Sequence, residues 1–400
     1  MSNDVIHQQS NSDEPAHSID NTNDRQRHLA FVLDIDGCIS KEGIPIPGSK
    51  EALRQLHTSR IPFVFCTNGG GQLESQRAKK LSATFDLPVS PEQVILSHTP
   101  LRYEVVDRMK DARVLVVGEH CGEVARSYGL TKAQDVREYG RRHPSLFPRR
   151  REVEDPPLVD DANDPVRAVL FFEDPEDLGE ALQLVLDVLL SNGNPSGPRV
   201  LLENDEAKQE VEVWFTNPDL VSYSQFVLWF LEICLNWLNL VSLSNMFLPQ
   251  VYSGLATHPR LTQGSYRMCL ETLFKSATSS TSTSYHSAIP NKTNTNSTKA
   301  QERNLFATTV GKPTPHTGKT ALSKLLSQCQ PNTLEQDLEI WTVGDNPFSD
   351  VALAHTMGWN SALVKTGIWD GDVSVLECHG VMPTKIVDSM AILIHKLLPK

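Results

Sequence analysis

The stretch that decides the fold is His-Leu-Ala-Phe-Val-Leu-Asp-Ile-Asp-Gly, residues 28–37. It begins with a short, mostly apolar run, and two aspartates, Asp34 and Asp36, follow the end of that run. Such a run without alternation is typical of a strand that is buried on both faces of a parallel sheet. Because alternate side chains of a strand share a face, both carboxylates can reach one ligand just beyond the strand.

The succession of strand and helix continues along the chain. The elements that we expect are strands at 61–66, 338–343 and 361–364 and helices at 49–59, 73–84 and 349–357. Strand, helix, strand and helix in that order predict right-handed crossovers. The sequence therefore predicts a doubly wound α/β domain.

A second set of strands and helices lies in the middle of the chain. The expected strands are 113–118, 166–172 and 211–215, and the expected helices are 122–128 and 178–190. The charged and Pro-rich stretch 135–165 is predicted to be a surface loop. We interpret this block as a small α/β unit that is inserted into the first domain.

These patterns predict the domain organisation. Residues 1–28 are polar, lack the apolar core of a signal peptide and are expected to form a disordered tail. The core domain is predicted in two parts, 29–111 and 217–400, with the inserted unit at 112–216 between them. Within the second part, the stretch 276–300 is rich in Ser, Thr and Asn and is predicted to be disordered.

Composition narrows the range of partners and compartments. The chain has 400 residues with 37 Lys plus Arg and 49 Asp plus Glu, which gives a net charge of −12. An acidic chain has no bulk attraction for nucleic acid or anionic lipid, so an anionic substrate needs a local positive site. The seven cysteines are scattered without a CxxC pair, which argues against a disulfide framework or structural zinc and indicates a reducing compartment.

Four segments place polar residues at or near the ends of expected core strands. They are Asp34–Gly37, Thr67–Gly69, Gly311–Pro313 and Gly344–Asp350. In open α/β sheets, ligands bind at the carboxyl edge of the strands. Each segment alone has a commoner structural explanation, such as a solvated acidic turn or a helix N-cap. The four together, in this order, favour a functional site.

The residue types in these segments suit phosphoryl transfer. Clustered carboxylates of Asp34, Asp36 and Asp345 repel one another and call for a cation, and Mg²⁺ prefers oxygen ligands. With the cation screening the charges, Asp34 can attack phosphorus as a nucleophile. Asp36 can protonate the leaving oxygen and then deprotonate the attacking water.

Positive charge and hydrogen-bond donors are available for the phosphate group. Thr67 offers a hydroxyl, while Asn68 and Gly69 offer an amide and backbone N–H groups. Lys312 offers a positive charge to both the phosphate and Asp34. Positioning and charge stabilisation of this kind do most of the work in phosphoryl transfer.

The chain resembles the haloacid dehalogenase (HAD) superfamily of phosphohydrolases. The four segments match its four motifs, and longer strings resemble subfamily IIA, in particular the eukaryotic cat eye syndrome critical region type branch. Those strings are Asp34-Ile-Asp-Gly, Pro45-Ile-Pro-Gly, Thr67-Asn-Gly-Gly-Gly, Ser97-His-Thr-Pro, Asn217-Pro-Asp and Gly344-Asp-Asn-Pro-Phe-Ser-Asp. The resemblance implies a Rossmann-like core with an inserted α/β cap of the C2 type, and a Mg²⁺-dependent phosphatase that forms an aspartyl-phosphate.

The resemblance also implies roles for particular residues. The metal ligands would be Asp34, Asp36, Asp345 and Asp350, with Asp350 behind Asp345. The phosphate contacts would be Thr67 and Lys312, together with Asn68 and Gly69. Relatives in this branch are linked to mitochondria, and some are fused to CDP-alcohol phosphatidyltransferase domains. The implied substrate is therefore a small phosphorylated metabolite, with a phospholipid precursor as one candidate.

Residues 221–257 depart from the family pattern. In relatives, a string like Asn217–Leu220 runs within a few residues into a string like His258–Gly264, whereas here the apolar run 226–248 lies between them. We favour a gene-model error such as a translated intron. A membrane span and an additional amphipathic helix stay open as alternatives, although Glu232 and two asparagines are unfavourable in a bilayer.

Several properties stay open at this stage. The compartment is mitochondrial by resemblance or else cytoplasmic, since the sequence has no clear targeting peptide. We expect no nucleic-acid partner and no membrane insertion, and the oligomeric state is undetermined. The alternative function is a non-catalytic HAD-fold binding or scaffold protein, but the presence of both Asp34 and Asp36 favours an enzyme.

Overall fold

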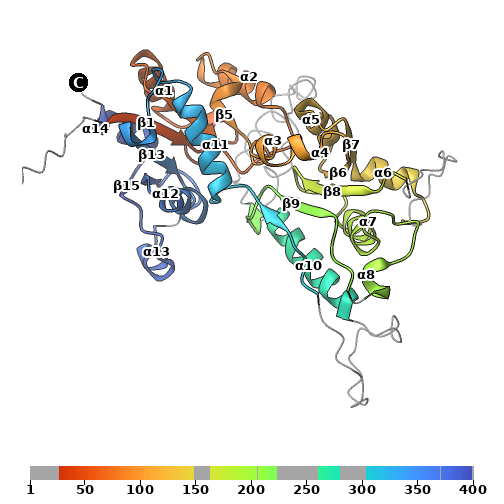
Figure 1. The fold of residues 1–400 in the computed structure, drawn as a ribbon. Coiled ribbons are helices and arrows are strands. Elements are labelled where there is room, and N and C mark those ends of the chain that lie inside the picture. The colour runs from red at the N-terminus through yellow and green to blue at the C-terminus, as the bar shows by residue number, and fades with distance from the viewer. Residues whose placement is uncertain are drawn as a thin grey trace, which may run out of the picture.

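Two parallel sheets organise the chain in the computed structural model (Figure 1). The structure describes residues 27–147, 163–204, 206–222, 260–279, 303–369 and 371–398. The predicted α/β class, with a doubly wound core and an inserted α/β cap, is confirmed by this architecture. The first sheet is the core sheet, and the second belongs to the cap.

The core sheet has six strands in the order β15-β14-β13-β1-β4-β5, and every pair is parallel. The strands are β1 (His28–Leu33), β4 (Phe63–Cys66), β5 (Val94–Ile95), β13 (Leu338–Gly344), β14 (Asn360–Val364) and β15 (Lys385–Val387). Its helices are α1 (Ser49–Thr58), α2 (Glu74–Phe85), α11 (Pro315–Leu326), α12 (Ala352–Met357), α13 (Val373–His379) and α14 (Met390–Leu397).

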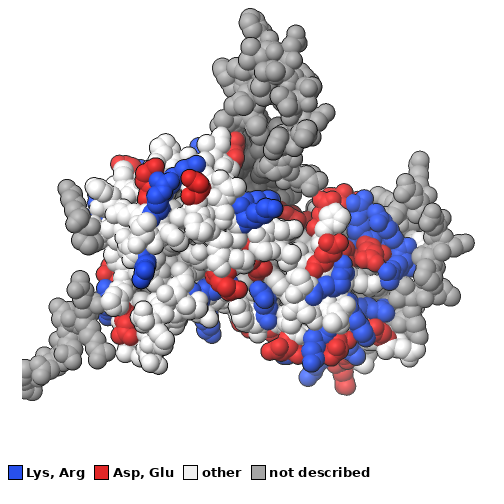
Figure 2. All heavy atoms as spheres, turned by 90° about the horizontal axis from the view of Figure 1, so that it is seen from above, with Lys and Arg blue, Asp and Glu red and all other residues white. Residues whose placement is uncertain are grey.

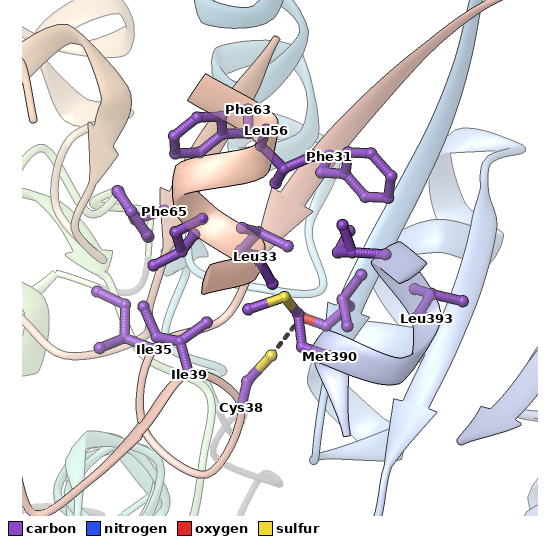
Figure 3. Packing of buried hydrophobic residues seen from close by; sticks show 14 of the residues in the cluster. Phe31, Leu33, Ile35, Cys38, Ile39, Leu56, Phe63, Phe65, Met390 and Leu393 are labelled. Atoms are coloured by element: carbon purple, nitrogen blue, oxygen red, sulfur yellow. Dashed lines mark hydrogen bonds between the residues drawn. The ribbon is translucent and has the colours of Figure 1, made fainter. Parts of the chain in front are cut away.

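Strand β1 lies between β13 and β4 in the core sheet, and both of its faces are buried. Phe31 and Leu33 point into a cluster with residues of α1, α2 and α14, whereas Ala30 and Val32 point into a cluster with residues of α11. This two-sided burial explains why the strand is a continuous apolar run in the sequence. Figure 3 shows the first cluster, in which the Cys38 thiol donates to the Val343 carbonyl over 3.4 Å, so that this cysteine is a packed side chain.

The cap sheet has five parallel strands in the order β12-β9-β8-β6-β7. They are β6 (Arg113–Val117), β7 (Lys132–Asp135), β8 (Val166–Phe171), β9 (Glu212–Phe215) and β12 (Thr308–Thr309). The helices of this half are α3 (Leu101–Glu104), α4 (Val106–Met109), α5 (Cys121–Tyr128), α6 (Val136–Arg142), α7 (Leu178–Leu190), α8 (Val200–Glu203) and α10 (Gln263–Ser279).

The boundary of the cap differs from the expected one. Helix α10 buries Tyr266, Leu270 and Phe274 in the same apolar cluster as α7, and β12 pairs with β9. These residues lie on the cap sheet although the sequence pattern assigned them to the second part of the core at 217–400. Leu101 and Val105 also pack in one apolar cluster with β6 and β8, and residues 221–222 pair with 260–261. We therefore propose a cap made of the described residues of 101–222, 260–279 and 303–310.

Other local predictions need correction. The stretch 135–165 was expected to be a loop, but α6 forms at 136–142 because Val136 and Tyr139 pack under the cap sheet. The expected helix at 349–357 begins with a π-helical turn at Pro347–Val351 and continues as α12. Helix α10 extends to Ser279, into the stretch expected to be disordered. Residues 280–302 and the tail 1–26 lie outside the described residues.

A short antiparallel strand pair flanks residues 223–259, which lie outside the described residues. Val221–Ser222 (β10) pairs antiparallel with Arg260–Leu261 (β11), so the two ends of the insertion lie side by side. A second antiparallel pair, β2 (Ser40–Lys41) with β3 (Ile44–Pro45), follows Asp36 in the core. Among the helices that the structure describes, none is long and apolar enough to cross a membrane, and the apolar run 226–248 lies outside the described residues.

Candidate active site

The predicted site residues converge at the carboxyl edge of the core sheet. Asp34 follows β1, Thr67 follows β4, and Asp345 follows β13, which are three neighbouring strands. Lys312 and Asp350 join them from the segment before α11 and from the π-helical turn. The neighbouring order of the strands brings together residues that are more than 300 positions apart in the sequence.

Lys312 is the centre of this group. Its Nζ lies 2.6 Å from Asp34 Oδ1 and 2.6 Å from Asp350 Oδ1, and it donates to the Cys66 carbonyl over 3.0 Å. Only 3% of the Lys312 side chain is exposed. Burial opposes the charge, but the carboxylates of Asp34 and Asp350 raise the pKa of Lys312 well above its usual value. The lysine is therefore a fixed buried cation.

Three buried carboxylates form a group that suits a divalent cation. Oxygen atoms of Asp34, Asp345 and Asp350 all lie within 4.8 Å of one another. Burial and the neighbouring charge of Asp34 raise the pKa of both Asp345 and Asp350 above the ordinary carboxylate range. One lysine does not neutralise three carboxylates, and the donor set is all oxygen, so the residues fit Mg²⁺.

A turn after β14 holds Asp345, and the sequence motifs did not reveal it. The Ile368 N–H donates to Asp345 Oδ2 over 2.7 Å, and Thr366 Oγ1 donates to the Gly37 carbonyl over 2.5 Å. A Cβ on Gly367 would lie 1.8 Å from Asp345 Oδ2, so only glycine fits there. The sequence signal that could have revealed this turn is Thr-Gly-Ile at 366–368, which follows the predicted strand 361–364.

Asp36 lies apart from the three clustered carboxylates. Its Oδ2 is 3.3 Å from Arg77 Nη2, and 62% of its side chain is exposed. Among the described residues, the group of close carboxylates consists of Asp34, Asp345 and Asp350 and does not include Asp36. Its position at the cavity wall is compatible with the predicted acid/base role, and its predicted role as a metal ligand stays a prediction.

The Thr67–Gly69 turn lies in the same cavity, but Asn68 has other contacts than expected. The Gly69 N–H donates to Thr67 Oγ1 over 3.0 Å. The Asn68 side chain accepts from the Lys312 N–H and donates to the Lys312 carbonyl and to Asp219 Oδ2. The amide of Asn68 therefore positions Lys312, and a contact of this residue with the phosphate group stays a prediction.

Core and cap enclose one cavity of about 350 Å³ around these residues. The cap side consists of six polar side chains that the sequence motifs left without a role. They are Glu173, Asp174, Asn217, Asp219, Thr262 and Gln263. Glu173 and Asp174 come shortly after β8, and Asn217 and Asp219 come shortly after β9. They lie at the carboxyl edge of the cap sheet, so the rule that located the core residues also applies to them.

Comparison with known proteins agrees with this geometry. Residues 31–131 match the family described as haloacid dehalogenase-like hydrolase, and residues 309–392 match the family described as HAD-hydrolase-like. A mitochondrial hydrolase of Saccharomyces cerevisiae is 29% identical over 388 residues, which cover 94% of this chain and 96% of that protein.

Two further matches extend the comparison. A cardiolipin synthase (CMP-forming)/mitochondrial hydrolase fusion protein of Schizosaccharomyces pombe is 28% identical over 86% of this chain, and the match spans half of that protein. The p-nitrophenyl phosphatase from Archaeoglobus fulgidus superposes with a TM-score of 0.54 over 93% of this chain and 100% of that chain, at 16% identity, which is a likeness of fold.

The family matches cover both parts of the core, and the fold and the motif residues agree with them. The chain therefore belongs to the haloacid dehalogenase superfamily and is a hydrolase of the phosphatase type.

Proposed function

We propose that the chain is a Mg²⁺-dependent phosphomonoesterase that transfers the phosphoryl group of a small metabolite to Asp34 and then to water. The observation that carries this proposal is the buried contact of Lys312 Nζ with Asp34 and Asp350, beside Asp345. Such an arrangement holds charge where a phosphate group needs it and excludes bulk water.

The proposed site residues divide the work. Asp34, Asp345 and Asp350 would hold the Mg²⁺ ion, which supplies positive charge that screens the phosphate oxygens from the attacking carboxylate. Lys312 binds Asp34 Oδ1 and so orients the carboxylate, leaving Oδ2 as the attacking atom. Thr67 and the Gly69 backbone would contact the phosphate oxygens. Asn68 holds Lys312 in place.

The reaction proceeds in two proposed steps. Asp34 forms a bond to phosphorus while the bond between phosphorus and the alcohol oxygen breaks, and Asp36 gives that oxygen a proton. Asp36 then takes a proton from a water molecule that attacks phosphorus, which releases phosphate and restores Asp34. Asp36 is paired with Arg77 in this structure, so this role requires the ion pair to open when substrate binds.

The cavity volume and the names of two relatives bear on the substrate and the compartment. The cavity of about 350 Å³ suits a small phosphorylated metabolite. The names of the two fungal relatives include mitochondrial hydrolase, and one of them is fused to a cardiolipin synthase. We therefore propose a mitochondrial enzyme with a phospholipid precursor among its candidate substrates. Fractionation of cells that express the tagged full chain tests the compartment, and enrichment in the cytosol would contradict it.

One assay separates the enzyme from the non-catalytic alternative. Hydrolysis of p-nitrophenyl phosphate is measured with and without Mg²⁺ for the wild type and for Asp34→Asn. We expect turnover that requires Mg²⁺ and that disappears in the variant. A folded wild-type protein without Mg²⁺-dependent turnover would support a binding or scaffold role instead.

A further inference from the structure

The end of cap strand β8 lies directly on the phosphate-binding turn of the core. A Cβ on Gly70 would lie 2.1 Å from the Phe172 carbonyl oxygen. A Cβ on Gly71 would lie 2.3 Å from Glu173 Oε2. Two glycines therefore allow the cap backbone and the Glu173 carboxylate to approach the turn that begins at Thr67.

Buried contacts fix the cap in this position. Ser97 Oγ and Thr216 Oγ1 lie 3.1 Å apart between core and cap. The His98 ring is fully buried and stacks on Phe172, with 4.6 Å between ring centroids. His98 Nδ1 also lies 2.8 Å from the Tyr128 hydroxyl of α5. The residues that follow Phe172 are thus held over the site by packed side chains.

The cap side of the cavity is acidic. Glu173, Asp174 and Asp219 contribute carboxylates to it, and its other polar groups are amides and a hydroxyl. Among the described residues that line the cavity, Lys312 is the one Lys, Arg or His, and it is bound to two core carboxylates. A ligand that reaches the cap side of the cavity therefore meets hydrogen-bond acceptors and negative charge.

Burial and neighbouring acidic groups disfavour negative charge at the cap side of the cavity. Burial and the charges of Asp174 and Glu119 raise the pKa of Glu173 to about 7. Burial and the charge of Asp219 raise the pKa of Asp174 to about 6. A second anionic group placed here would add repulsion in poorly solvated surroundings, whereas a hydroxyl or ammonium group would donate hydrogen bonds.

We propose that Glu173 and Asp174 select the alcohol part of the substrate. The site takes phosphomonoesters whose alcohol carries hydroxyl or ammonium donors, and it rejects those that carry a second anionic group. This inference rests on the proposed function, because the alcohol part meets the cap side of the cavity only if the phosphate group is bound at Asp34. The two carboxylates determine specificity and take no part in bond making or breaking.

Matched substrates test the proposal. Glycerol 1-phosphate and 3-phosphoglycerate share a three-carbon skeleton and differ at one end, where a hydroxymethyl group is replaced by a carboxylate. Phosphoethanolamine supplies the ammonium group, so it separates an amine preference from a hydroxyl preference. For each compound kcat/KM is measured, or, where there is no turnover, competitive inhibition of p-nitrophenyl phosphate hydrolysis.

The wild type should favour glycerol 1-phosphate over 3-phosphoglycerate by about tenfold or more. The double variant Glu173→Gln/Asp174→Asn, which keeps the side-chain shapes, should reduce that ratio about tenfold, mainly through KM for 3-phosphoglycerate. The control is Glu176→Gln, because Glu176 is a nearby cap carboxylate that is paired with Arg137 and is absent from the cavity lining. The control should keep the wild-type ratio.

The outcomes distinguish two kinds of failure. If p-nitrophenyl phosphate is hydrolysed with Mg²⁺ but both three-carbon compounds react equally well, or the double variant keeps the ratio, this inference is wrong and the proposed function stands. If that hydrolysis is absent or is unaffected by Asp34→Asn, both fail. Should the double variant not fold by circular dichroism, the two single variants decide, each with a smaller shift in the same direction.

Discussion

The core and the cap contribute different kinds of side chain to one cavity. In the core, Lys312 holds Asp34 and Asp350, and a backbone N–H holds Asp345, so charged atoms have fixed partners. In the cap, Glu173 and Asp174 present acidic groups to the same space. Under the proposed function, the core would carry out the reaction and the cap would select the substrate.

The two regions also differ at the surface. Figure 2 shows charged side chains crowded over the cap, whereas the visible face of the core is mostly uncharged. Several of the cap charges are exposed ion pairs, such as Arg108 with Glu212 and Arg167 with Glu210. Exposed pairs of this kind contribute little to stability. Removing a buried charge of the core site should therefore lower the free energy of unfolding more than removing one of these exposed charges.

The largest effect is expected for Asp34→Asn, a change confined to the core. It removes the attacking carboxylate but keeps its shape, so kcat should fall by roughly 10⁴-fold or more for every substrate. The control is Asp388→Asn, a carboxylate on the surface that pairs with Lys365. Residual turnover within tenfold of the wild type would assign the nucleophile to another residue and would remove the distinction between core and cap.

The next effect is on stability and concerns Lys312→Met. The change leaves Asp34 and Asp350 buried without their cation, which should lower the free energy of unfolding by about 3–5 kcal/mol. Urea denaturation in buffer without divalent ions measures it. Lys365→Met is the matched control, since its pair with Asp388 is exposed and should contribute less than about 1 kcal/mol. Equal losses would contradict a special role for the buried lysine.

A smaller effect is expected for Gly367→Ala. The added methyl group would displace the Asp345 carboxylate, so the apparent affinity for Mg²⁺ should fall about 10–100-fold. Titration of activity with Mg²⁺ measures this change. Gly179→Ala in cap helix α7 is the control, because a Cβ there would make an ordinary contact at 3.5 Å. An unchanged Mg²⁺ requirement would show that Asp345 does not bind the ion.

The smallest effect is expected for Tyr128→Phe, at the contact between cap and core. The lost hydroxyl donates to Glu74 Oε1 over 2.6 Å and contacts His98. We expect KM for glycerol 1-phosphate to rise a few-fold while kcat for p-nitrophenyl phosphate stays near the wild-type value. Tyr103→Phe is the control, since Tyr103 is 60% exposed. A loss in kcat without a change in KM would place this contact in the reaction step.

The sequence was most informative where burial left a simple pattern. The strand at 28–33 and the helix at 178–190 have the predicted limits, because an apolar run and a helical apolar period are visible without knowledge of the fold. Helix α11 was not predicted. Its buried face includes small residues such as Thr317 and Gly318, which lies against Met357, and these give no apolar period.

The site was predictable to a similar degree. The core residues follow strands in short motifs, so Asp34, Thr67, Lys312 and Asp345 could be identified locally. The contact of Asn68 with Asp219 joins residues 151 positions apart, and no local pattern reveals it. Glu173 and Asp174 are followed by further acidic residues and so resemble a solvated turn, although the fold turns them toward the cavity.

Mapping the covalent intermediate tests the central claim most directly. The enzyme is mixed with p-nitrophenyl phosphate and Mg²⁺, quenched in acid within the first turnover and digested, and the peptides are analysed by mass spectrometry. We predict one phosphorylated peptide, with the phosphoryl group on Asp34 and none in Asp34→Asn. A phosphoryl group on any other residue, or release of phosphate in the first turnover without a labelled peptide, would contradict the account.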